Sequence, residues 1–137
     1  MSSKFIFHSK FGLGLYKFKG DITLNELLNL LVESYSNPEF KDLSYTILDF
    51  RECTFSFEAS ALKQIVQLVE KHKDVTQNVR ATLLVSDFKV MALSTLFQHE
   101  LGIQKQIVIN STVLQTINFF DLQITVNELE GLLNNLN

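Results

Sequence analysis

The sequence predicts an α/β fold with a mixed, mainly parallel sheet of about five strands and with helices largely on one face. The first observation behind this prediction is a change of hydrophobic period along the chain. Short runs of alternating or continuous apolar residues are separated by longer segments whose apolar residues recur at helical spacing. The second is their order, two strands first and then helix and strand in alternation, which is typical of parallel strands joined by right-handed crossovers.

The N-terminal segment predicts two antiparallel strands. Residues 5–7 and 13–18 alternate between two faces, and Lys17 falls on a face that otherwise carries leucines. Gly12 and Gly14 predict a turn or bulge between the strands, because two glycines are too few for a phosphate-binding loop. This hairpin is expected to form the mixed edge of the sheet.

Each later helix is expected to begin at a side-chain cap. Thr23 and Glu26 form a capping box at the start of a Leu-rich helix, which Pro38 ends. Further caps are expected at Ser56, at Ser86 or Asp87, at Ser111, and at Thr125 in a second box with Glu128. The remaining strands are expected at residues 45–50, 80–85 and 107–109.

The length of 137 residues is that of one ordinary domain, so residues 1–137 are expected to fold as a unit. The core is expected at about residues 3–120, and residues 121–137 are expected to form a C-terminal helical extension. The leucine stripe of this extension either packs on the open face of the sheet or pairs with a second copy in a homodimer.

The composition excludes several classes of protein. A formal net charge of −3 with scattered basic residues gives no pull toward nucleic acid. No apolar run is long enough to cross a bilayer and no apolar leader begins the chain, which predicts a cytoplasmic protein without a membrane partner. Cys53 is the only cysteine, so an intrachain disulfide is excluded. No cofactor is expected, and His8, His72 and His99 lack the spacing of a helical metal site.

Four segments resemble a known family in their order and spacing: GDITLNELL, YTILDFRECTFSFEASAL, RATLLVSDFKVMALSTLF and IVINSTVLQTINFF. The family is the STAS-like superfamily, named for sulfate transporters and anti-sigma factor antagonists, and the resemblance is to its bacterial SpoIIAA-like domains. Gly20 to Thr23 and Asp49 match the family's pattern. In the last segment Asn110 replaces an aromatic residue, and Thr116 stands near the position of a small one.

The resemblance implies a STAS/SpoIIAA-like sandwich that acts as a noncatalytic regulatory module by binding a protein partner. It also implies a phosphoacceptor serine at the start of the helix after the central strand, where this chain offers Ser56 and Ser60. Neither serine follows an Asp, so the family's Asp-Ser pair is missing. The residues expected in and around the partner-binding loop are Asp49, Arg51, Glu52, Phe55, Phe57 and Glu58.

Two other functions stay open. A group of phenylalanines predicts either core filling or a pocket for a small apolar ligand. Its members are Phe50, Phe97, Phe119 and Phe120, together with Phe55 and Phe57 of the loop. The charges beside the loop predict a solvated rim with an ion pair, or the acid/base set of a hydrolase. The hydrolase is the weaker alternative because the G-x-S-x-G elbow is absent.

Overall fold

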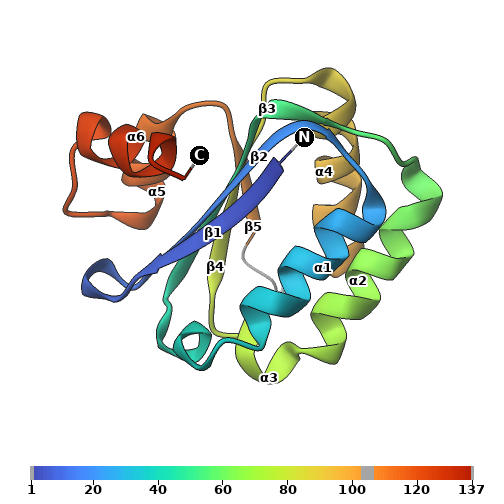
Figure 1. Cartoon of the computed structure of the whole chain (residues 1–137), viewed down its shortest axis with the longest axis horizontal. Coiled ribbons are helices and arrows are strands. Elements are labelled where there is room, and N and C mark those ends of the chain that lie inside the picture. Colours follow the sequence, from blue (N-terminus) through green and yellow to red (C-terminus); the bar gives the residue numbers. More distant parts are fainter. Residues whose placement is uncertain (1, 103–106, 137) are drawn as a thin grey trace.

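The computed structural model describes residues 2–102 and 107–136. Within these residues one five-stranded sheet has its strands in sequence order, and its helices lie on both faces (Figure 1). The strands are β1 (Ser2–His8), β2 (Leu13–Ile22), β3 (Tyr45–Phe55), β4 (Arg80–Leu84) and β5 (Ile107–Asn110). β1 pairs with β2 in antiparallel fashion, and every other pair is parallel. The predicted mixed, mainly parallel sheet is therefore confirmed.

The helices divide into two groups (Figure 1). They are α1 (Leu24–Tyr35), α2 (Leu62–Lys71), α3 (Lys73–Thr76), α4 (Phe88–Leu101), α5 (Val113–Phe120) and α6 (Val126–Asn134). Short 3-10 turns at Ser9–Phe11, Pro38–Asp42 and Ala59–Ala61 complete the connections. The long helices α1, α2 and α4 cover one face of the sheet, whereas α5 and α6 lie against the other.

Several predicted helix ends are confirmed because they depend on local hydrogen bonds. The side chains of Thr23 and Thr125 accept from the backbone of the third helical residue, which in both helices is a glutamate that closes the box. Asp87 caps α4 by accepting from the Val90 amide, and Gly102 ends that helix. The cap of α5 was predicted one residue early. The cap is Thr112, whose side chain accepts from the Gln115 amide. The side chain of Gln115 accepts in return from the Thr112 amide, so a glutamine closes the capping box here in place of a glutamate.

The central strand was predicted to end at residue 50, and this prediction is wrong. β3 continues to Phe55, and between two of its pairs with β2 the register shifts. Lys17 lies opposite Asp49, and Lys19 lies opposite Glu52. Between these pairs, the single residue Phe18 of β2 faces two residues of β3, Phe50 and Arg51. Such a bulge interrupts the period of two by which a strand is recognised. The expected loop at 51–58 is therefore mostly strand.

Ser56 was expected to cap the second helix, and this prediction is also wrong. The extended chain continues past the end of β3, and the Ser56 amide donates to the carbonyl of Ile22 at 2.9 Å. A 3-10 turn, Ala59–Ala61, follows. α2 then begins at Leu62 without a side-chain cap.

Each face of the sheet has its own apolar core. On the face covered by α1, α2 and α4, Tyr16 and Phe18 of β2 pack among leucines and phenylalanines. On the opposite face, Leu13 and Leu15 of β2 pack against the fully buried Leu129 and Leu133 of α6. The leucine stripe of the C-terminal extension therefore packs back on the sheet. It is not available as a dimer surface.

Candidate functional site at the carboxyl edge of the sheet

The carboxyl ends of the parallel strands meet at one edge, where ligand and partner sites of α/β proteins commonly lie. A shallow, open depression lies at this edge. It is lined by Gly20, Asp21, Arg51, Glu52, Cys53, Thr54, Ser86 and Asp87. Three carboxylates line it, those of Asp21, Glu52 and Asp87. The one guanidinium, that of Arg51, is bound to carboxylates outside the lining, as described below. The edge is therefore acidic.

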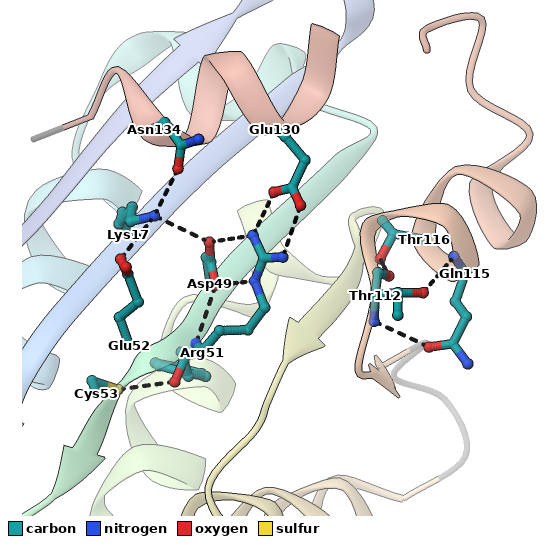
Figure 2. A network of polar contacts seen from close by, with 11 residues as sticks. Lys17, Asp49, Arg51, Glu52, Cys53, Thr112, Gln115, Thr116, Glu130 and Asn134 are labelled. Atoms are coloured by element: carbon teal, nitrogen blue, oxygen red, sulfur yellow. Dashed lines mark hydrogen bonds and ion pairs between the residues drawn. The ribbon is translucent and has the colours of Figure 1, made fainter. Parts of the chain in front are cut away.

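Beside the depression, a network of charged side chains lies between the sheet and α6 (Figure 2). Asp49 is only 1 % exposed, and Arg51 donates to its two oxygens from Nε and Nη2, both at 2.9 Å. The Arg51 amide also donates to Asp49 Oδ1 at 3.1 Å. Such a bidentate contact is among the strongest ion pairs that proteins form.

The network continues to both sides of this pair. Arg51 also holds Glu130 of α6, with 2.8 Å from Nη2 to Oε1 and 3.2 Å from Nη1 to Oε2. Lys17 is buried, and its Nζ lies 3.6 Å from Asp49 Oδ2, 3.1 Å from Glu52 Oε2 and 3.4 Å from Asn134 Oδ1. Strands β2 and β3 are thereby tied to α6 through charges as well as through leucines.

Protonation in the network is fixed by the same contacts. Burial alone would raise the pKa of Asp49, but the hydrogen bonds and charge of Arg51, with the charge of Lys17, outweigh burial and hold that pKa below its ordinary value. Hydrogen bonds to Asp49 and Glu130 raise the pKa of Arg51 above its ordinary value. Asp49 is therefore an ionised structural carboxylate near neutral pH, and it is not poised for proton transfer there.

Cys53 does not offer a nucleophile either. Its thiol is buried and donates to the carbonyl of Phe50 at 3.5 Å. Burial, with the charges of Asp49 and Asp87, raises the pKa of Cys53 to about 12. The thiolate is the reactive form of cysteine, so the thiol is inert in the native protein.

The structure separates the residues that were expected to bind a partner. Asp49, Phe55 and Phe57 are buried, so their side chains do not reach the surface. Arg51 is committed to two carboxylates, whereas Glu52 and Glu58 extend into solvent. The two candidate phosphoacceptors, Ser56 and Ser60, are both exposed on the connection between β3 and α2.

One residue at this edge was missed by the sequence reasoning. Phe88, the first residue of α4, is 87 % exposed. It lies next to the connection after β3, because its neighbour Lys89 forms a 3.0 Å ion pair with Glu58. The available signal was its position directly after the cap Asp87, outside the buried stripe of α4. We call Ser56, Glu58, Ser60, Phe88 and Lys89 the edge surface.

The predicted phenylalanine cluster is split between the two faces of the sheet. Phe50, Phe55, Phe57 and Phe97 line a common cavity on the α1, α2 and α4 side. Phe119 and Phe120 belong to α5 on the opposite side, where Phe120 stacks on Tyr45 at 4.6 Å and the guanidinium of Arg80 lies 4.4 Å from the ring centre of Phe119. Their assignment to the same pocket was wrong, because α5 crosses to the other face of the sheet.

Within residues 2–102 and 107–136, no group of three or more His, Cys, Asp or Glu side chains is placed to hold a metal ion. In the same ranges, no hydrogen bond joins Ser56 to a histidine, so it lacks the activating base of a nucleophilic serine. No helix in this part of the chain is long and apolar enough to cross a membrane.

The chain has the fold that the resemblance in the sequence implied. Among solved structures the chain is similar to the anti-sigma factor antagonist SpoIIAA in its unphosphorylated form, with a TM-score of 0.57. The match covers 88 % of this chain and 98 % of that one at 11 % sequence identity. No family model matches the sequence, and no curated protein matches it. The similarity is therefore one of fold.

Proposed function

We propose that this protein is a noncatalytic regulatory module that binds a protein partner through the edge surface. The observation that carries the proposal is the exposure of Phe88 on the first turn of a helix, beside the connection after β3. Aromatic residues are enriched among the side chains that dominate binding energy in protein interfaces. The likeness of fold to an anti-sigma factor antagonist supports the same class of function.

The charges around Phe88 indicate the chemistry of the partner. The adjacent depression carries Asp21, Glu52 and Asp87, and Glu58 of the edge surface is 78 % exposed despite its pair with Lys89. A complementary partner presents an apolar pocket for the Phe88 ring, surrounded by basic side chains. Such complementarity steers association and rejects acidic surfaces.

Phosphorylation of Ser56 or Ser60 is a natural control of this surface. Both serines are exposed and lie within a few residues of Glu58. A phosphate adds about −1.5 to −2 charges at neutral pH, which changes the fit to any charged partner. Intact-mass analysis of protein purified from its own host reports the modification, and the variants Ser56→Ala and Ser60→Ala assign it. An unmodified mass under every growth condition removes this part of the proposal.

Site-specific photo-crosslinking tests the proposal directly. A benzophenone amino acid at position 88, introduced in host cells, is expected to capture a protein that the same probe at position 114 does not capture. Leu114 is a suitable control because it is also an exposed apolar helix residue, but it lies on α5 at the other face. A homodimer would appear here as a crosslink between two copies of the chain.

The affinity of the captured protein for variants of this chain then tests whether Phe88 is part of the binding surface. Phe88→Ala is expected to weaken binding of the purified partner by about 10-fold or more, as for the anchor of an interface. Leu96→Ala on the exposed side of the same helix serves as the matched truncation and is expected to have little effect. Equal affinities for the wild type and Phe88→Ala would refute the assignment of this surface.

A further inference from the structure

We propose that the cavity between the sheet and helices α1, α2 and α4 is a binding site for a small, uncharged, apolar molecule. The cavity has a volume of about 110 Å³ and lies beneath the aromatic side chains of β3 and α4. Protein interiors are normally packed without voids larger than a water molecule. A void of this size is therefore a feature to be explained.

The lining of the cavity determines what it accepts. Phe50, Phe55, Phe57 and Phe97 form much of the wall, aliphatic side chains form most of the rest, and no charged residue lines it. Tyr16 and Tyr35 also line the cavity, and burial raises the pKa of both, so they stay neutral. A charged ligand would lose its hydration here without gaining a partner.

Water is a poor occupant for the same reason. A buried water needs two to four polar partners, whereas the walls here are mainly apolar. The lining carries five hydroxyls, those of Tyr16, Tyr35, Thr46, Thr76 and Ser94, and that of Thr76 already donates to the carbonyl of Val69 at 3.2 Å. An apolar cavity of about 150 Å³ engineered into another protein stays dry and binds benzene or xenon. The cavity described here is of the same order, which suits a monocyclic aromatic or a short branched hydrocarbon.

The structure also shows where such a molecule would enter. Most lining residues are buried, but Val79, Ala81 and Ile107 near the amino ends of β4 and β5 are partly exposed, as is Phe97 of α4. The cavity therefore comes nearest to solvent between α4 and the amino end of β4. The edge surface lies at the opposite ends of the strands, where Phe55 and Phe57 of the lining flank its Ser56.

Benzene is a suitable probe, and the midpoint of thermal unfolding is a suitable readout. A ligand that binds only the native state raises this midpoint, because it stabilises that state by RT ln(1 + c/Kd), where c is the free ligand concentration. We expect an increase of a few degrees for the wild-type protein in benzene-saturated buffer. In two-dimensional methyl NMR, resonances of Leu83 and Leu93 are expected to shift, whereas those of Leu129 and Leu133 on the opposite face are not.

A matched pair of variants locates the site. Ala81→Leu fills the cavity from its wall and is expected to remove most of the benzene-induced increase. Ala92→Leu makes the same change on the exposed side of α4 and is expected to retain the increase. If Ala81→Leu does not fold, Ser94→Val fills the same space from α4.

The result is decisive in each direction. No increase in the midpoint and no methyl shift for the wild type would overturn the proposal and leave the cavity as an unfilled part of the core. An increase that Ala81→Leu retains in full would place benzene elsewhere and would also overturn it. Crystals pressurised with xenon give a second readout, in which a xenon atom is expected between Phe50 and Phe97.

Discussion

Arg51 of β3 and Glu130 of α6 form a two-point contact, with Nη2 and Nη1 of the guanidinium 2.8 Å and 3.2 Å from the two carboxylate oxygens. The same guanidinium holds Asp49 from its other side. Arg51 therefore joins the central strand of the sheet to the last helix, at a point where leucines of α6 also pack. This contact makes the C-terminal extension an integral part of the fold.

Glu130→Gln is expected to loosen α6 without unfolding the protein. The pair is partly exposed, so water screens it and its loss costs about 0.5–1.5 kcal/mol of unfolding free energy. Hydrogen exchange of the α6 amides is expected to accelerate more than that of α1. The control is Glu33→Gln, the same change at an exposed position of α1. Unchanged exchange in α6 would show that the leucines alone hold the helix.

Asp49 is expected to make stability fall in acid. Its pKa is lower in the native protein than the value of about 3.9 in the unfolded chain, so the unfolded chain binds more protons as the pH falls. The stabilisation is complete above about pH 5 and is lost progressively as the pH falls through the native pKa. Urea unfolding between pH 7 and pH 3 measures this decline.

Asp49→Asn is expected to flatten that decline and to destabilise the protein at pH 7. The variant leaves the charges of Lys17 and Arg51 without their buried counter-ion, at a cost of about 3 kcal/mol. Asp42→Asn, at an exposed position in the turn Pro38–Asp42, is the matched control. A pH profile equal to that of the wild type would mean that other carboxylates govern acid stability.

Ser56→Ala is expected to change the free energy of unfolding by less than about 0.5 kcal/mol, because Ser56 does not cap α2. Thr125→Ala removes an actual cap and is expected to cost about 1 kcal/mol. Chemical denaturation of the two variants measures the contrast. Ser56→Ala is therefore a clean variant for the phosphorylation test, and a loss as large as that of Thr125→Ala would mean that the hydroxyl has a structural role.

The thiol of Cys53 is expected to resist alkylation by iodoacetamide at pH 8.5 in the native protein. Its pKa of about 12 and its burial leave almost no accessible thiolate. Denatured protein is expected to react rapidly, so the extent of labelling reports unfolding. Rapid labelling under native conditions, measured by mass spectrometry, would contradict the burial of this side chain.

Local signals predicted most of the fold. The boxes at Thr23 and Thr125, the cap Asp87 and the stop Gly102 depend on residues within one helical turn, so they are legible in the sequence. The alternation of Leu13, Leu15 and Lys17 against Tyr16 and Phe18 correctly assigned the two faces of β2. The bulge in β3 could not be predicted from local sequence, because its extra residue is defined only by how β3 pairs with β2.

The candidate site was harder to predict because it depends on contacts between distant segments. Ser56 looked like a cap, since nothing local revealed that β3 continues to Phe55. The cluster of phenylalanines looked continuous, although Phe119 and Phe120 lie across the sheet from Phe50. The exposure of Phe88 was indicated only by its position outside the buried stripe of α4, and that signal was not used in the prediction.

Short-range periodicity and capping were enough to predict the α/β class, the order of the elements and most helix ends. The sequence did not reveal the network of Lys17, Asp49, Arg51 and Glu130, because Arg51 and Glu130 are 79 positions apart and meet only when α6 docks on the sheet. The cavity beside Phe50 and Phe97 was equally hidden in the sequence, because the space left between side chains depends on how whole helices and strands pack together.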